Sequence, residues 1–130
     1  RESRRIVGEY RLTLDDLLHN ARFDDVVALN CRALDRHLKG DVFKYDLLTG
    51  NHDIPLRALI PKGVQNLLVA GRCISGTHEV HASYRVKGPC LAMGQAAGVA
   101  AALAVEEGIA PRGVGVAQLQ NTLRAQGAIL

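Results

Sequence analysis

Residues 66–108 read NLLVAGRCISGTHEVHASYRVKGPCLAMGQAAGVAAALAVEEG, and this stretch decides the fold. Its residues 67–70 are all apolar and end at Gly71, which is typical of a strand buried on both faces of a parallel sheet. Residues 72–87 are mostly polar, and we expect them to form a long loop. A buried strand followed by such a loop predicts an α/β protein whose ligand lies beyond the carboxyl end of that strand.

A helix is predicted over residues 89–107. Pro89 suits the first helical position, where no N–H is needed, and Gly108 suits the position just after the last turn. One face of this helix carries almost no side chains, because small residues recur there at helical spacing: Gly94, Ala97, Gly98, Ala101 and Ala102. Another backbone can approach that face closely. The free N–H groups at the helix start favour an anionic or electron-accepting ligand.

The residues before this stretch predict short elements. Residues 3–12 mix apolar and charged side chains and predict a partly exposed strand. Thr13 predicts a helix N-cap, followed by a short helix through Leu18 with aspartates in its first turn. Residues 23–33 fit either a helix or a strand, and the pattern does not decide between them.

The middle and the end of the chain predict further elements. Residues 35–51 are rich in charge and predict a hairpin or surface excursion, with an edge strand over residues 42–45. Residues 54–60 predict another strand, and residues 61–63 predict a turn after it. An amphipathic pattern that begins at Val116 predicts a last helix.

The composition is that of a folded globular chain. It has 130 residues, of which 48% are hydrophobic, and this suits one domain with one core. The net charge is only +3 and the basic residues are interleaved with acids, so we expect no nucleic-acid partner. Residues 1–10 hold no apolar export signal, so we expect a cytoplasmic location. Residues 88–105 are uncharged but dominated by alanine and glycine, so we expect a buried helix and no membrane partner.

Neither a disulfide framework nor a metal site is predicted. The three cysteines are far apart and lack metal-ligand spacing: Cys31, Cys73 and Cys90. His78, Glu79 and His81 form H-E-x-H, which is one residue short of the zinc-binding spacing H-E-x-x-H.

Three motifs in the quoted stretch occur in one order at fitting distances: A-G-R at 70–72, S-x-R-V at 83–86 and M-G-Q-A-A-G at 93–98. With them, residues 66–104 closely resemble the carboxyl-terminal FAD-binding segment of the FAD-dependent oxidoreductases that have a glutathione-reductase-like flavin domain. The similarity also covers residues 1–18, 54–63 and 116–130.

The resemblance implies that FAD is the cofactor and that hydride passes between a small-molecule substrate and flavin N5. It implies that the backbone at Gly71 lies close to the ribityl and pyrophosphate part of FAD. Arg72 would contact the same part through its backbone or through a salt link to phosphate. The pyrimidine edge of the flavin ring would lie against four consecutive residues: Arg85, Val86, Lys87 and Gly88. The start of the following helix would stabilise negative charge on the reduced ring.

The resemblance also suggests candidate catalytic residues. His78 or His81 would lie beside the flavin and could exchange a proton with a substrate next to N5, or both could only close the loop. Arg85 could bind a substrate carboxylate through two hydrogen bonds, or could be a surface arginine.

Other residues near the expected flavin leave alternatives open. Lys87 and Gly88 stand where the family more often has Met and Pro. Cys90, in the first helical turn, could be a reactive thiolate or a buried structural thiol. We expect Arg4 and Arg5 to be solvated, unless one of them faces the cofactor.

One part that such flavoproteins use is not in the sequence. They hold the ADP half of FAD with an amino-terminal strand, G-x-G-x-x-G and helix, and no such motif occurs here. We therefore expect a missing amino-terminal FAD-binding half, or a partner subunit that supplies it, and little activity from this chain alone. Residues 61–130 would form the C-terminal part of a Rossmann-like FAD-binding domain. Residues 1–60 would be the β-rich tail of a substrate or cap domain that re-enters it.

Two other functions compete with this hypothesis. The chain could be a non-catalytic fragment or interaction module that docks through its Ala/Gly helix face. It could also be an α/β protein that binds a nucleotide other than a flavin.

Overall fold

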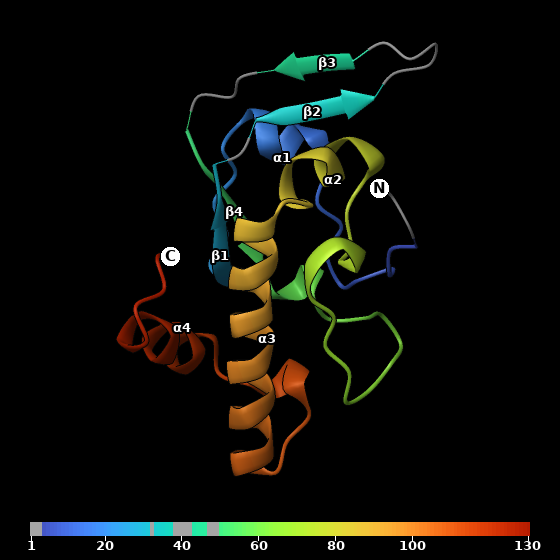
Figure 1. The fold of residues 1–130 in the computed structure, drawn as a ribbon. Helices are drawn as coiled ribbons and strands as arrows, with labels where there is room; N and C mark the ends of the chain where they lie inside the picture. Colours follow the sequence, from blue (N-terminus) through green and yellow to red (C-terminus); the bar gives the residue numbers. More distant parts are fainter. Residues whose placement is uncertain (1–3, 32, 38–42, 47–49) are drawn as a thin grey trace.

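The computed structural model describes four segments: residues 4–31, 33–37, 43–46 and 50–130. The longest element, helix α3 (Lys87–Glu107), runs lengthwise through the molecule (Figure 1). Strand β1 (Val26–Asn30) packs against α3 and pairs antiparallel with β4 (His52–Pro55). A second antiparallel pair, β2 (Leu34–His37) and β3 (Phe43–Asp46), lies at one end of the molecule beside helix α2. The fold is therefore a mixture of helices and small two-stranded sheets.

The strand β1 answers the question that the sequence left open for residues 23–33. Its β-branched residues Val26 and Val27 suit a pleated strand, and all four residues of its partner β4 are buried. Strands β2 and β3 confirm the predicted hairpin and its edge strand, although residues 38–42 and 47–49 of the predicted segment lie outside the described residues.

Helix α1 (Leu14–Leu18) begins where the sequence predicts. The backbone N–H of Asp16 donates to Thr13 Oγ1 at 3.2 Å, and the N–H of Thr13 donates to Asp16 Oδ2 at 2.8 Å. This capping box satisfies two N–H groups that a helix start otherwise leaves without partners. The prediction of a Thr13 N-cap is confirmed.

Helices α3 and α4 are also close to their predictions. Helix α3 begins at Lys87, two residues before its predicted start, and Gly108 ends it with a φ of 65° that favours glycine. Helix α4 (Val116–Ala125) begins at the predicted residue and buries Leu119 and Leu123, which join the core beneath α3.

The long loop predicted for residues 72–87 is wrong, because it contains helix α2 (His78–Tyr84). This helix buries Val80 and Tyr84 at a spacing of one helical turn, and the hydroxyl of Tyr84 donates to the carbonyl of Ile74 at 3.4 Å. A helix this short is unstable alone, so tertiary burial rather than local propensity forms it.

The buried strand predicted for residues 67–70 is wrong as well. These residues form no strand and pair with none in the described part of the chain, and Leu67 is 46% exposed. One backbone bond holds the segment, from the N–H of Val69 to the carbonyl of Leu59 at 2.9 Å. A strand buried on both faces needs neighbouring strands in its sheet and a layer packed on each face, and the described residues supply no such sheet there.

Two other predicted strands are replaced by different backbone structure. The described part of the predicted strand at 3–12, residues 4–12, makes only isolated bridges, with Gly8 opposite Pro61 and Leu12 opposite Gly76, so the strand predicted there is wrong. The strand predicted over residues 54–60 stops at Pro55, and a 3-10 turn (Leu56–Ala58) follows. The chain turns there because Asp25 binds two consecutive amides: its carbonyl accepts from Leu56 N–H at 2.8 Å and its carboxylate accepts from Arg57 N–H at 3.0 Å.

One core joins the two segments into which the sequence was divided. Leu12 and Ile54 from residues 1–60 belong to the same buried cluster as Met93 and Leu119 from residues 61–130. The division into the tail of a substrate domain and part of an FAD domain stays a prediction.

The small-residue face of α3 is largely uncovered. Gly94 and Gly98 are exposed, and a Cβ added to either would meet nothing within 4 Å. Within the described residues, α3 is also the one helix long and apolar enough to cross a membrane, with a mean hydropathy of 1.5 and 33% of the segment buried. Core helices of soluble proteins have the same properties, so this is weak evidence for a span.

Candidate functional site

The loop after residue 70 and the junction between α2 and α3 adjoin each other. The loop forms a 3-10 turn (Gly71–Cys73), and Nε of Arg72 donates to the carbonyl of Arg85 at 3.0 Å. Gly71 has a φ of 80°, and a Cβ on it would lie 3.9 Å from Cys90 Sγ in the first turn of α3. The structure therefore brings Gly71, Arg72 and Arg85 together, and the other predicted cofactor contacts follow directly: Val86, Lys87 and Gly88.

The start of α3 is electropositive. Val86 is extended, with φ −80° and ψ 165°, and no side chain caps the helix that follows it. The first turn holds no acidic residue, while Lys87 and Gly88 are exposed to solvent. A helix start without a capping side chain directs N–H groups and partial positive charge outward, and Arg72, Arg85 and Lys87 add full charges around it. This region can hold an anionic or electron-accepting group.

The two candidate histidines lie in different environments. His78 is the first residue of α2 and is exposed, whereas His81 is only 1% exposed. Burial lowers the pKa of His81 to about 4, with further contributions from the positive charges of Arg5 and Arg85. Within the described residues, His81 Nε2 has no hydrogen-bond partner. His81 is therefore a neutral imidazole at pH 7, while only His78 faces solvent.

The structure favours the structural alternative for Cys90. Burial raises the pKa of its thiol, and Sγ donates to the carbonyl of Tyr84 at 3.6 Å. A thiol that is held neutral is a poor nucleophile. Cys31 and Cys73 are exposed free thiols, and the described residues contain no group of three or more potential metal ligands.

A buried polar cluster under α2 could not be seen in the sequence. Asn30 Nδ2 donates to Ser83 Oγ at 2.8 Å and lies 3.3 Å from His52 Nε2. His52 is 2% exposed, and burial lowers its pKa to about 4. The cluster links β1, β4 and α2 through groups that must stay uncharged.

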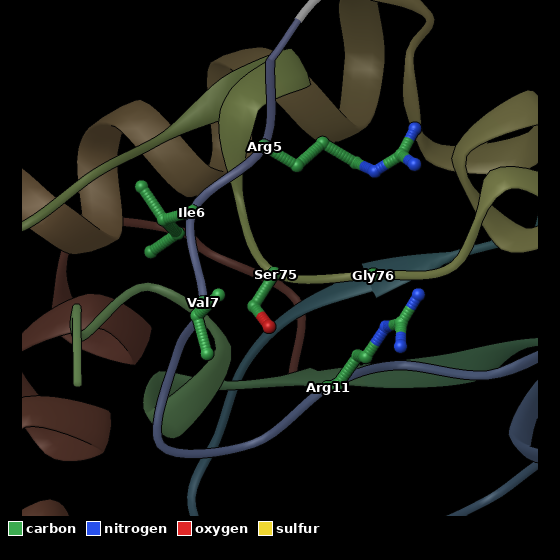
Figure 2. A pocket seen from close by; sticks show the side chains of 6 residues that line it. All are labelled: Arg5, Ile6, Val7, Arg11, Ser75 and Gly76. Atoms are coloured by element: carbon green, nitrogen blue, oxygen red, sulfur yellow. The ribbon is translucent and has the colours of Figure 1, made fainter.

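The sequence reasoning also missed a pocket of about 300 Å³ that opens beside the same loop (Figure 2). Its lining comes from two segments far apart in sequence: Arg5, Ile6, Val7, Arg11, Ser75 and Gly76. Three backbone bonds join the segments: Ile6 N–H donates to the carbonyl of Cys73 at 2.9 Å, Leu12 N–H to the carbonyl of Ser75 at 3.2 Å, and Thr77 N–H to the carbonyl of Leu12 at 2.8 Å. Arg4 is exposed as expected, but Arg5 is half-buried. The only indication of this pocket in the sequence is that residues 1–11 contain four arginines but two glutamates.

A second pocket, of about 460 Å³, lies on another part of the surface near α4. Three of its four charged lining side chains form ion pairs within the described part of the chain, and Asp24 is the exception. Arg57 binds Asp25 at 2.9 Å and Arg112 binds Glu9 at 3.1 Å. This pocket has little capacity left for a charged ligand.

An uncapped helix start, a glycine with positive φ and nearby arginines are features that suit an anionic or electron-accepting cofactor. The sequence comparison makes this specific, because residues 1–123 match the family model of the FAD dependent oxidoreductases. The chain belongs to that family, so its cofactor is FAD and its chemistry is flavin-dependent redox chemistry. Comparison with curated proteins and with solved structures found no match.

The described residues suit one half of FAD better than the other. The flavin edge is rich in acceptor atoms, and it fits the exposed N–H groups of Lys87 and Gly88 and the cationic groups beside them. The ADP half requires a glycine-rich loop before a helix, and the sequence has no G-x-G-x-x-G.

Proposed function

We propose that the start of α3 and the turn Gly71–Cys73 hold the flavin end of FAD. The chain would then be the carboxyl-terminal portion of a Rossmann-like, glutathione-reductase-like FAD domain. The observation that carries the proposal is the uncapped start of α3 beside the hydrogen bond from Arg72 to the carbonyl of Arg85. The family match to residues 1–123 supplies the identity of the cofactor.

Each residue of this region has a role that follows from its environment. Gly71 leaves the backbone open to close approach, because it carries no side chain at a φ of 80°. Arg72 fixes the turn to the α2–α3 junction, which keeps the helix start in place. The backbone of Val86, Lys87 and Gly88 would donate to the pyrimidine edge of the flavin, and the helix dipole would stabilise negative charge there.

Bound FAD would supply the hydride acceptor at N5 for a small-molecule substrate. His78 is the better candidate for proton exchange with that substrate, because it is exposed whereas His81 is buried and neutral. Arg85 is half-buried at the junction, where its charge could hold an anionic group of the substrate or of the flavin.

We further propose that another polypeptide segment, an amino-terminal half or a partner subunit, holds the ADP half of FAD. The exposed face of α3 around Gly94 and Gly98 would let its backbone approach closely. Residues 61–130 would then complete the FAD domain, and residues 1–60 would be the tail of a substrate domain. The cytoplasmic location stays a prediction.

The test separates flavin binding from folding. Val86→Asp gives α3 an N-cap and puts a negative charge where the flavin edge would bind. Gly115→Asp is the matched control, because it caps the uncapped start of α4 in the same way. Both changes should stabilise the fold by about 0.5–2 kcal/mol in urea unfolding.

Titration with FMN, followed by its fluorescence, gives the functional readout. The parent protein and Gly115→Asp should quench FMN, ADP should not compete, and Val86→Asp should bind at least about tenfold more weakly. Equal FMN binding by the two variants, or no binding by the parent, would refute the proposal.

The alternative is a non-catalytic module that docks through α3. The exposed glycine face favours this alternative, since a Cβ added to Gly94 or Gly98 would meet nothing within 4 Å. In that case Gly98→Leu would abolish association with a partner, and Val86→Asp would leave it intact.

A further inference from the structure

The pocket lined by Arg5, Arg11 and Ser75 is a second cationic site beside the proposed flavin region. The residues that line it carry two guanidinium groups and no carboxylate. Figure 2 shows both arginine side chains extending in the same direction, on either side of the Ser75–Gly76 backbone in that view. Two arginines that line one pocket favour an anionic ligand, because a guanidinium can bind a carboxylate through paired hydrogen bonds.

Most of the charges around the pocket are positive, and the acid Glu79 is the exception. Arg5, Arg85 and Arg72 all lower the pKa of His81, whose burial is the largest cause, so the pocket and the proposed flavin region share one positive field. The pKa of Glu79 is lowered, mainly by a hydrogen bond from its own backbone, and the charge of Arg11 contributes to this lowering. Arg11 itself is exposed and forms no hydrogen bond or ion pair with any described residue. Its guanidinium can therefore bind a ligand without breaking an existing contact.

The position of the pocket connects it to the proposed function. Ser75 and Gly76 lie on the loop that begins at Gly71, and the N–H of Ile6 binds the carbonyl of Cys73 at 2.9 Å. Besides its polar residues, the lining includes the apolar side chains of Ile6 and Val7. A volume of about 300 Å³ is at the lower end for a ligand site and is too small for a whole dinucleotide. The lining thus suits a small molecule that has an anionic end and an apolar body.

We infer that this pocket binds the carboxylate of a small organic acid, with Arg5 and Arg11 as the groups that hold it. The inference deepens the proposed function and rests on it, since the acid would be the substrate that reduces or reoxidises the flavin. A phosphate group could make the same hydrogen bonds, and the pyrophosphate of FAD itself is the competing ligand. The apolar lining residues favour the carboxylic acid, because a pyrophosphate would gain nothing from Ile6 and Val7.

The experiment measures binding of benzoate and acetate to the purified protein by calorimetry, each beside its neutral amide. We expect both acids to bind more tightly than benzamide and acetamide by about tenfold or more, with benzoate the tighter acid. Arg11→Gln removes the charge of an exposed side chain and should weaken benzoate binding by about tenfold or more. Arg124→Gln, an equal loss of charge at an exposed site on α4, should leave binding unchanged.

Each result has a defined reading. Equal binding of acids and amides, no acid binding, or equal effects of Arg11→Gln and Arg124→Gln would overturn the inference. Inorganic pyrophosphate that displaces benzoate, together with weaker FMN or FAD binding by Arg11→Gln, would assign the pocket to the cofactor instead. Acid binding that depends on Arg11 in a protein that does not quench FMN would keep the acid site and refute the flavin proposal alone.

Discussion

Lowering the pH from 7 to 5 should destabilise the protein through its two buried histidines. His52 and His81 are 2% and 1% exposed, and burial lowers the pKa of each to about 4 from an ordinary value of 6.5. Because the folded-state pKa lies below the unfolded-state value, the folded form binds fewer protons than the unfolded chain between these values. Stability is therefore fully present above pH 6.5 and is lost as the pH falls towards 4.

The size of the loss follows from linkage. At pH 5 an unfolded histidine is almost fully protonated and a buried one is mostly neutral, which costs about 2 kcal/mol for each residue. Both together cost about 4 kcal/mol, a large fraction of the 5–15 kcal/mol that typically stabilises a domain. The free energy of unfolding in urea, measured by far-ultraviolet circular dichroism at both pH values, should fall by about this amount.

A single substitution separates this cause from the titration of other groups. For His81→Leu, the free energy of unfolding should fall by only about half as much between pH 7 and pH 5, whatever the stability of this variant at pH 7. The matched control His19→Gln replaces a side chain that is 74% exposed and should keep the full loss. If His81→Leu loses as much stability as the parent, His81 does not change its protonation on unfolding and the argument fails.

Two further predictions concern packing and hydrogen bonding in the fold, and both use urea unfolding at pH 7. Gly76→Ala should lower the free energy of unfolding by about 1–3 kcal/mol, because its Cβ would lie 2.8 Å from the buried hydroxyl of Tyr84. The control Gly94→Ala has open space around its Cβ and should raise the free energy of unfolding by about 0.5–1 kcal/mol. Similar changes for both variants would contradict the packing around Gly76. Asp25→Ala should lower the free energy of unfolding by about 1–3 kcal/mol, mainly because the backbone N–H of Arg57 loses its acceptor at 3.0 Å. Asp25→Asn keeps an acceptor oxygen and should lower it less. A larger loss for Asp25→Asn than for Asp25→Ala would contradict this cause.

Where the end of a helix carries a local sequence signal, that signal predicted the helix. Thr13 and Gly108 mark helix ends through hydrogen bonds and dihedral preferences that act within a few residues. Helix α2 lacks such a signal, since no side chain caps it at Thr77 and it depends on burying Tyr84. Residues 67–70 have the composition of a buried strand, but burial requires neighbours that a local pattern cannot supply.

The candidate site was partly predictable for the same reason. Gly71, Arg72 and Arg85 were predicted from the family resemblance, and the structure brings them together through the contact from Arg72 to the carbonyl of Arg85. The pocket around Arg5 and Arg11 was not predicted, because it forms only when residues 5–12 cross residues 73–77. That crossing is a tertiary contact, and nothing in either segment alone indicates it.

The short interruption between α2 and α3 determines where the long helix has its positive end. Arg85 keeps nearly helical angles, with φ −71° and ψ −3°, and only Val86 turns to an extended conformation with ψ 165°. If the chain continued as one helix from His78 to Glu107, the N–H groups of Lys87 and Gly88 would bind carbonyls of the preceding turn. The positive end would then lie at His78, away from Gly71. Rotation about the backbone of one residue thus creates a second helix start in the interior of the chain, directly beside the arginines.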